Sequence, residues 1–205
     1  MVKKYVIDTS AFMTENIRDK DDSMEEAIVH VLALFERCRD EEIAEFYMPD
    51  STYEELEEIL EDSVDEDVVR KLKSYVERRS PSRHEVSVPG DMLYGFIEEM
   101  RKRVNKGLRL SEKAVKDLDE MDEEPEEEYY DQVDVIISDL RGKYKEALRK
   151  GIVDSKEDLD LLLLARELDA TVVSEDRGVL NWAEELGLTH LEGNELPEVL
   201  EEYLD

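Results

Sequence analysis

The sequence contains very little cysteine: Cys38 is the only one among 205 residues. A single thiol forms no intramolecular disulfide, and it excludes zinc clusters of cysteines and Cys-X-X-Cys redox motifs. Long apolar runs are also missing. No segment approaches the roughly 20 apolar residues of a membrane-spanning helix, and residues 1–8 lack the apolar run of a signal peptide. We therefore expect a soluble protein of a reducing cytoplasm, with no membrane partner.

Basic residues are scarce as well. The 27 lysines and arginines face 57 aspartates and glutamates, and the formal net charge is -30. Like charges at this density repel strongly in dilute buffer, whereas the Debye length shrinks to about 3 Å at 1 M salt. The composition therefore indicates a halophilic protein, with an acidic interaction surface as the alternative. Disorder is disfavoured because 40% of the residues are hydrophobic and lie in periodic blocks.

Apolar periodicity predicts strands at both ends of the chain and helices throughout its middle. Short apolar runs predict strands at 4–7, 45–49, 171–174 and 189–191. Spacings of three and four residues predict helices at 22–39, 53–60, 65–79, 92–104, 111–121, 126–148, 158–168, 178–186 and 196–203. Because strands and helices alternate in the C-terminal third, we expect an α/β core with a parallel sheet. This core comprises residues 1–62 and 140–205, and a helical, hairpin-like insertion occupies 63–139.

Aspartates gather where the predicted apolar elements begin or end. Asp8 and Asp176 each follow a strand, and Asp158 and Asp160 lie where an apolar helix begins. In a parallel sheet with right-handed crossovers, these positions converge at one edge. Ionised carboxylates about 4 to 6 Å apart repel by roughly 3 to 4 kcal/mol at an effective dielectric near 20. A cation is therefore required to offset the repulsion.

Carboxylate ligands favour Mg²⁺ or Mn²⁺ over zinc. One or two such ions can generate a hydroxide nucleophile and stabilise the charges of phosphodiester cleavage. The three histidines lie outside the acid group, so no conventional general base is predicted; they are His30, His84 and His190. The residues thus predict a metal-dependent hydrolytic site.

Some of these residues also have structural explanations. Ser155-Lys156-Glu157-Asp158 fits a capping box, so Asp158 can serve only to begin a helix. Asp154 is intermediate between the two roles, and Glu55 has no evident partner. The hydroxyl residues near the acids are expected to support or cap them rather than act as nucleophiles; they are Thr9, Ser10 and Ser174.

Two basic groups stand out in this acidic chain. The first contains Arg70, Lys71, Lys73, Arg78, Arg79 and Arg83. The second contains Arg101, Lys102, Arg103, Lys106, Arg109, Lys113 and Lys116. Each group either balances neighbouring acids through salt bridges or contacts phosphates, and the sequence leaves both possibilities open.

Four acidic motifs resemble those of the PIN-domain nucleases. They are Val6-Ile7-Asp8-Thr9-Ser10, Glu55-Leu56, Asp160-Leu161-Leu162-Leu163-Leu164-Ala165 and Val173-Ser174-Glu175-Asp176. Each motif alone is weak, but their order along the chain matches that family. The resemblance implies a three-layer α/β/α sandwich with a central parallel sheet. It also implies a Mg²⁺- or Mn²⁺-dependent endoribonuclease whose carboxylates correspond to Asp8, Glu55, Asp160 and Asp176.

Two further features resemble the minimal protein-only ribonuclease P family, often called HARP. One is the expanded acid group Asp154-x-x-x-Asp158-x-Asp160, and the other is the long helical block. This resemblance implies removal of the 5′ leader from precursor tRNA without an obligatory RNA subunit. It also implies that Asp154 and Asp158 join the site, and that the chain forms a large homo-oligomer through the helical insertion.

On this basis the predicted catalytic residues are Asp8, Asp154, Asp158, Asp160 and Asp176. The predicted metal ligands are Asp8, Asp158, Asp160 and Asp176, with Glu55 as a further candidate. The predicted RNA contacts are Arg70, Lys71, Arg78, Arg79, Arg101, Arg103, Lys106 and Arg109. Because the net charge of -30 opposes RNA binding, recognition is expected to depend on shape, bridging metal and repeated contacts across an oligomer.

Three alternatives remain open at this stage. A toxin-like PIN endoribonuclease acting on mRNA or tRNA shares the core motifs but not the long helical block. A non-catalytic oligomeric scaffold would use the acid group only to cap a helix. A phosphatase of the Asp-x-Asp type is disfavoured because Ser10 occupies the second position after Asp8.

Overall fold

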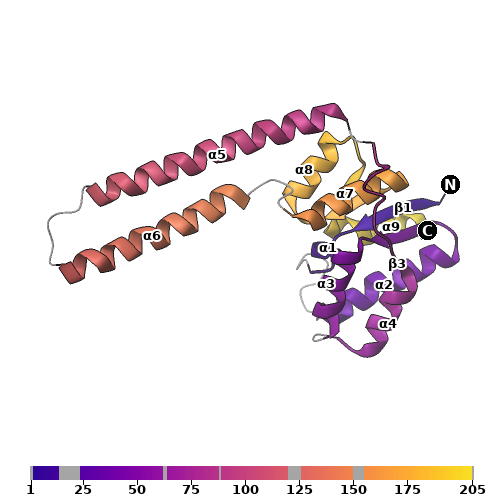
Figure 1. Cartoon of the computed structure of the whole chain (residues 1–205). Helices are drawn as coiled ribbons and strands as arrows, with labels where there is room; N and C mark the ends of the chain where they lie inside the picture. The colour runs from indigo at the N-terminus through magenta and orange to yellow at the C-terminus, as the bar shows by residue number, and fades with distance from the viewer. Residues whose placement is uncertain are drawn as a thin grey trace. The chain divides into compact units, whose positions relative to one another are not determined.

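The computed structural model describes residues 2–13, 24–61, 64–87, 89–119, 126–149 and 155–204. The chain forms two compact units (Figure 1). The first, here called the core unit, comprises Met1–Val88 and Val153–Asp205, and the second, the helical unit, comprises Pro89–Ile152. The predicted insertion boundaries, 63 and 139, both shift. Residues 66–78 add a helix and a strand to the core, and the helix that begins at residue 126 belongs to the helical unit through its whole length.

A five-stranded parallel sheet forms the centre of the core unit, in the order β3-β2-β1-β4-β5. The strands are β1 (Lys3–Ile7), β2 (Ala44–Met48), β3 (Val76–Arg78), β4 (Thr171–Ser174) and β5 (His190–Glu192). The prediction of a parallel sheet is confirmed, but β3 was predicted to be the end of a helix. Three residues are too few to show a period of two, and β3 is defined by its pairing with β2, in which Val76 lies opposite Phe46.

Helices cover both faces of the sheet, which confirms the predicted three-layer α/β/α arrangement. The core-unit helices are α1 (Ser10–Met13), α2 (Met24–Asp40), α3 (Asp50–Glu61), α4 (Glu66–Tyr75), α7 (Lys156–Leu168), α8 (Arg177–Glu185), the 3-10 turn η2 (Gly193–Glu195) and α9 (Leu196–Leu204). On one side α2 packs against β2, α4 and α9. On the other side α7 packs against β1 and β4, and α8 packs against β4 and β5.

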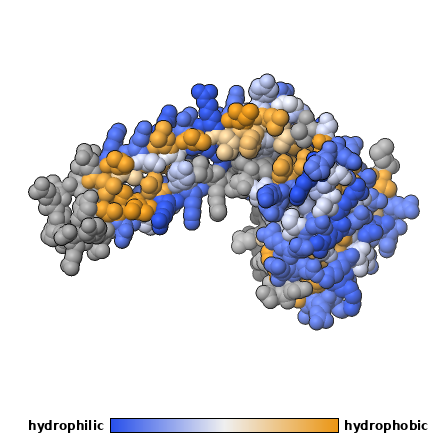
Figure 2. Space-filling model, in the orientation of Figure 1, coloured by the Kyte–Doolittle hydropathy of each residue, from blue (hydrophilic) through white to orange (hydrophobic). Residues whose placement is uncertain are grey.

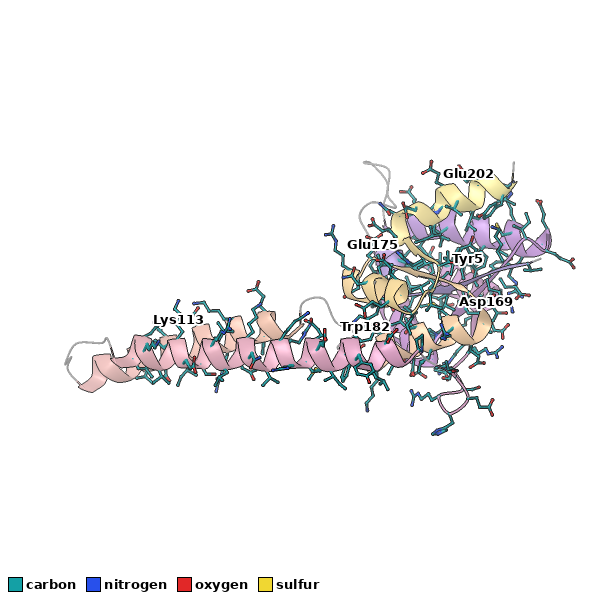
Figure 3. The ribbon with its side chains drawn as sticks, turned by 90° about the horizontal axis from the view of Figure 1, so that it is seen from above. Tyr5, Lys113, Asp169, Glu175, Trp182 and Glu202 are labelled. Atoms are coloured by element: carbon teal, nitrogen blue, oxygen red, sulfur yellow. The ribbon has the colours of Figure 1, made fainter. Side chains whose placement is uncertain are left out.

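Aromatic stacking holds α2 against the sheet. The rings of Phe35 and Phe46 stack with centroids 3.7 Å apart, and Tyr5 stacks on Phe46 at 5.8 Å. All three side chains are buried, and Tyr5 lies in the interior of the core unit (Figure 3). Such pairs contribute roughly 0.5–1.5 kcal/mol beyond the burial of their area. They help to keep β1, which leads to Asp8, in place between its neighbours.

The helical unit consists of two long antiparallel helices, α5 (Gly90–Asp119) and α6 (Glu126–Arg149) (Figure 1). The sequence predicted two helices where α5 is continuous. The predicted break contains Gly107, and this glycine has a packing role: a Cβ there would lie 2.7 Å from the Tyr144 ring on α6. Among the described helices, none combines the length and the apolar character that a membrane span requires.

Candidate active site

Asp8 lies at the carboxyl edge of the sheet, directly after β1. Its backbone N–H donates to the Val173 carbonyl oxygen at 2.9 Å, which joins it to β4. Two hydroxyls, from Ser10 and Ser174, donate to one oxygen of its carboxylate, Oδ2. The Ser174 bond measures 2.7 Å, and Ser174 is fully buried. The Asp8 side chain is therefore held in one orientation by Ser174 at the end of β4 and by Ser10 at the start of α1.

The same hydroxyls also organise the residues that follow β4. Ser174 Oγ accepts from the Asp176 N–H, and Ser10 Oγ accepts from the Glu175 N–H, each at 3.0 Å. One hydrogen-bond network thus joins the end of β1 to the turn that carries Asp176. The sequence predicted a supporting role for these serines, and the network places them in contact with the Asp8 carboxylate.

Asp176 has a structural role that the sequence did not predict. It is the N-cap residue of α8, and its Oδ1 accepts a hydrogen bond from the Gly178 N–H. A cap of this kind is worth about 1 kcal/mol. The carboxylate is thereby held at the N-terminus of α8, where the helix dipole stabilises its negative charge.

Glu55, which has no evident partner in the sequence, contacts the same edge. Thr9 Oγ1 lies 3.1 Å from Glu55 Oε2 on α3 and 3.1 Å from the Thr52 carbonyl oxygen. Thr9 is buried and follows Asp8 directly. The hydroxyl therefore links α3 to the residue after β1, and it brings a third carboxylate toward the network.

Asp160 lies in α7 and is only 7% exposed. The N-cap residue of this helix is Ser155, whose hydroxyl accepts from the Asp158 N–H at 2.9 Å. This bond is the serine half of the predicted capping box, so Asp158 contributes to the start of the helix through its backbone. Asp154, the remaining acid of the group, lies outside the described residues.

The Asp160 carboxylate is paired with Arg83, a contact that the sequence did not predict. Arg83 Nε donates to Asp160 Oδ1 at 2.8 Å, and Arg83 Nη2 donates to Oδ2. Hydrogen bonding and charge attraction from Asp160 raise the pKa of Arg83. The two residues are 77 positions apart, and the only sequence signal was the membership of Arg83 in a basic group.

These side chains fit a hard divalent cation by their chemistry. Among the described residues, no three or more His, Cys, Asp or Glu side chains form a complete metal cluster. The available donors at this edge are nevertheless carboxylate oxygens, which Mg²⁺ and Mn²⁺ prefer. The buried carboxylate of Asp160 already forms a salt bridge with a cation, the Arg83 guanidinium.

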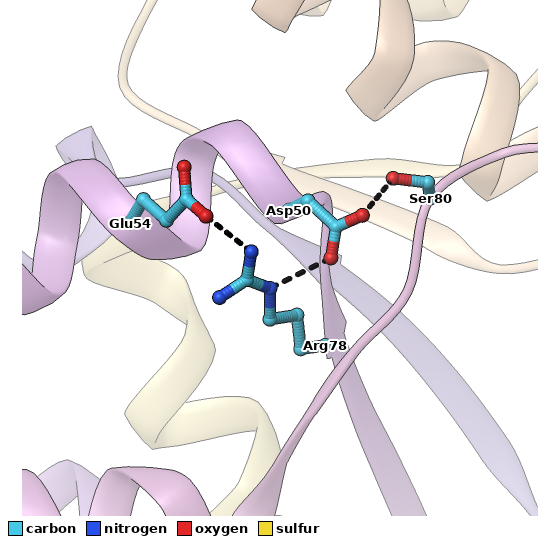
Figure 4. A network of polar contacts seen from close by, with 4 residues as sticks. All are labelled: Asp50, Glu54, Arg78 and Ser80. Carbon is cyan, nitrogen blue, oxygen red and sulfur yellow. Dashed lines mark hydrogen bonds and ion pairs between the residues drawn. The ribbon is translucent and has the colours of Figure 1, made fainter.

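Three of the four predicted RNA-contacting residues of the core unit, all of them arginines, are paired with acids. Arg78 donates to Asp50 and to Glu54 on α3 (Figure 4). Arg79 pairs with Glu167 at 2.7 Å and Arg70 pairs with Asp67 at 2.7 Å. Lys71 is half-buried. The salt-bridge explanation left open by the sequence therefore applies to the three arginines, and phosphate binding by them requires these pairs to open.

The predicted RNA-contacting residues of the helical unit divide into two kinds. Arg101, Lys106 and Arg109 are exposed on α5, whereas Arg103 is 5% exposed. Arg103 Nε lies 3.4 Å from Glu99 Oε1 on the same helix. The three exposed side chains are therefore the accessible members of this group.

Comparison with known proteins decides between the nuclease families. The family model of a PINc domain ribonuclease matches residues 4–205. A protein of Haloarcula marismortui named RNA-free ribonuclease P is 46% identical over 205 residues, covering 98% of this chain and 92% of the relative. The chain belongs to the RNA-free ribonuclease P family of PINc ribonucleases.

Other members of this family align over a similar length. A Thermococcus kodakarensis RNA-free ribonuclease P is 40% identical and covers 97% of this chain and 94% of the relative. An RNA-free ribonuclease P from Thermodesulfovibrio yellowstonii is 38% identical, and the alignment covers 98% of this chain and 93% of the relative. Family membership therefore extends over the helical unit as well as the core unit.

Proposed function

We propose that this protein is a divalent-metal-dependent endoribonuclease that removes the 5′ leader from precursor tRNA and works without an RNA subunit. The observation that carries the proposal is the near full-length similarity to RNA-free ribonucleases P, which includes the helical unit. A toxin-like PIN nuclease would share the core motifs only. The acids at the carboxyl edge of the sheet supply the chemistry that the proposal requires.

The proposed cation is Mg²⁺ or Mn²⁺, held by Asp8, Asp158, Asp160 and Asp176, with Asp154 and Glu55 as additional acids. When bound, such an ion supplies an activated water and stabilises the negative charge that develops on the phosphate. The protein's part is to hold the carboxylates. Ser10 and Ser174 orient Asp8, and α8 fixes Asp176 at its N-terminus.

Cleavage of a precursor tRNA with mapped ends tests this proposal. The unaltered protein with Mg²⁺ is expected to make a single cut at the mature 5′ end. Asp160→Asn and Asp8→Asn should each reduce kcat by more than about 100-fold, since even partners of metal ligands are worth roughly 10- to 100-fold. Cleavage inside the tRNA or in mRNA, or full activity of either variant, would contradict the assignment.

RNA recognition is proposed to use the exposed basic residues of the helical unit, Arg101, Lys106 and Arg109. Each phosphate contact adds about 0.7 to 0.9 to the slope of log affinity against log salt. Because the net charge is -30, a single chain gains little attraction to RNA. Several chains that contact one tRNA together would raise the effective affinity.

A second copy of this chain is the proposed partner of the helical unit. Large apolar residues form a stripe along α5 and remain exposed; they include Leu93 (58%), Ile97 (62%), Val104 (63%), Leu108 (56%) and Val115 (65%). Figure 2 shows apolar patches along the two helices. Apolar surface of this extent marks an interface in a soluble protein, and the self-complementary contacts of a homo-oligomer would bury it.

Light scattering after size-exclusion chromatography tests the assembly. Val104→Glu places a charge within the apolar stripe and should dissociate the oligomer to smaller species. Asn105→Glu is the matched control, because it adds the same charge at the exposed neighbouring position and should leave the mass unchanged. A monomeric unaltered protein would contradict the proposed assembly.

A further inference from the structure

The segment 79–87 connects β3 to the helical unit, and hydrogen bonds hold it along α7. Arg79 Nη2 donates to Glu167 Oε1 and the Ser82 N–H donates to Glu167 Oε2, both at 2.7 Å. Arg166 Nε donates to the Ser87 carbonyl oxygen at 2.6 Å. These bonds from Ser82 and Arg79 lower the pKa of Glu167. The segment is therefore anchored to the helix at three points.

The start of this segment is anchored to α3 as well. Ser80 donates to Asp50, and the preceding Arg78 donates to Asp50 and Glu54 (Figure 4). The Ser80 hydroxyl and Arg78 lower the pKa of Asp50. Because the segment is anchored at both ends, the position of Arg83 relative to α7 is fixed.

In this position the Arg83 guanidinium contacts the carboxylate of Asp160. Glu167 and Asp160 are seven positions apart, which is about two turns, so they lie on the same side of α7. The Asp160 side chain is 9% exposed while that of Arg83 is 60% exposed. The guanidinium therefore covers a buried carboxylate from the solvent side, and it uses both carboxylate oxygens in a bidentate pair.

We propose that Arg83 and a divalent cation compete for Asp160, and that Arg83 binds a phosphate of the RNA substrate once the cation has displaced it. This proposal rests on the proposed function, because it takes Asp160 as a metal ligand. Arg83 occupies both oxygens of the Asp160 carboxylate, and two cations held close together repel each other. A planar guanidinium with its fork of donors fits a phosphate as well as it fits a carboxylate. Arg83 thus neutralises Asp160 in the metal-free protein and becomes a substrate-binding residue in the loaded one.

Calorimetric titration with Mn²⁺ in the absence of RNA tests the competition. Arg83→Gln should bind Mn²⁺ about 3- to 10-fold more tightly than the unaltered protein, because the competing cation is gone. Arg83→Lys should show a smaller gain, since an ammonium cannot form the fork. If Arg83 instead orients Asp160 for the metal, both variants bind Mn²⁺ more weakly, and that result would overturn the proposal, as would unchanged affinity.

Arg39→Gln is the matched control for the change in net charge. Arg39 lies near the end of α2, just before β2 begins and thus at the opposite edge of the sheet, and it donates to the Ser74 carbonyl oxygen. The Mn²⁺ affinity of the Arg39→Gln variant should equal that of the unaltered protein. Circular dichroism melts of all three variants verify folding before the affinities are compared.

Steady-state cleavage of precursor tRNA tests the second half of the proposal. Arg83→Gln should raise KM by about 10-fold or more at saturating Mn²⁺, and Arg83→Lys should recover part of the loss. An unchanged KM would overturn the phosphate-binding role. Cleavage by the unaltered protein is measured separately and tests the proposed function alone. The Mn²⁺ titration tests the competition at Asp160 without RNA. Failure of the proposed function can therefore be distinguished from failure of the Arg83 proposal.

Discussion

At the scale of single residues, hydroxyl groups hold the candidate site together. Ser174 is completely buried, donates to Asp8 and accepts from the backbone of Asp176. Thr9 makes the corresponding link to Glu55. A carboxylate that hydrogen bonds already hold in one orientation loses little further conformational freedom when it binds a cation. We therefore expect these hydroxyls to hold the candidate ligands in place rather than to act as nucleophiles.

We expect Ser174→Ala to weaken Mn²⁺ binding by about 10- to 100-fold, which is the usual effect of losing the partner of a metal ligand. It should also cost about 1 kcal/mol of unfolding free energy, because the hydrogen bonds of the buried Ser174 hydroxyl to Asp8 and to the Asp176 N–H are lost. Calorimetric titration and urea unfolding measure the two effects. Ser74→Ala is the control, since that exposed hydroxyl donates only within α4, to Arg70. Unchanged Mn²⁺ affinity in Ser174→Ala would argue against a role for Asp8 as a ligand.

At the scale of elements, close approaches of the backbone decide where elements can pack. Gly193 begins η2, and a Cβ there would lie 2.8 Å from the Ala11 Cα and 3.1 Å from Glu175 Oε1. The same glutamate accepts from the Asn194 N–H at 2.9 Å. The turn after β5 therefore packs directly on α1 and on the loop that carries Asp176. This packing is possible only without a side chain at position 193.

Gly193→Ala is expected to lower the unfolding free energy by about 1–3 kcal/mol, as overpacking against backbone usually does. The substitution should also displace the loop of Asp176 and reduce cleavage. Gly142→Ala on α6 is the matched comparison, because no atom lies within 4 Å of its added Cβ. There the gain in helix propensity should stabilise the protein by up to about 1 kcal/mol. Thermal melts of the two variants should therefore shift in opposite directions, and a shared direction would contradict the packing role of Gly193.

At the scale of the whole molecule, charge dominates behaviour in solution. The 57 acidic residues outnumber the 27 basic ones and leave a net charge of -30, which ion pairs within the chain cannot change. Unfolding separates like charges, so self-repulsion favours the unfolded chain in dilute buffer. Added salt screens this repulsion over distances beyond the Debye length.

The free energy of unfolding should therefore rise as KCl is increased from 0.1 M to 2 M, and it should do so most steeply at the low end. Urea is the appropriate denaturant because guanidinium chloride is itself a salt. Lithium or sodium chloride at equal ionic strength should give a similar rise if screening is the cause. A stability that is independent of salt, or that falls with it, would contradict the halophilic interpretation.

Much of the core could be predicted from the sequence because its signals are local. Tyr5 to Ile7 form a short apolar run rich in β-branched and aromatic residues, which favours a buried strand. Leu161 to Leu164 lie in an apolar helix that is buried against the sheet. Alternation of such elements implies parallel pairing, and parallel pairing places Asp8 beside Ser174. The positions of Asp8 and Asp176 at one edge follow from these steps.

Other features depend on contacts between residues far apart in the chain. β3 exists because Val76 pairs with Phe46, and α5 continues through Gly107, which provides room for the Tyr144 ring. The capping role of Asp176 and the contact between Glu55 and Thr9 depend on the conformation of loops, which the sequence did not predict. No local pattern distinguishes these outcomes.

Composition and short-range spacing were enough to predict the parallel α/β core, the strand-end acids and the strongly acidic character of the chain, because each of these depends on one element or on residue counts. The pairing of the Asp160 carboxylate with Arg83 arises only in the folded chain. That pair depends on β3 and on the anchored segment 79–87, which together bring residues 77 positions apart into contact. Burial of a carboxylate requires a compensating cation, but which cation reaches it is a property of the fold.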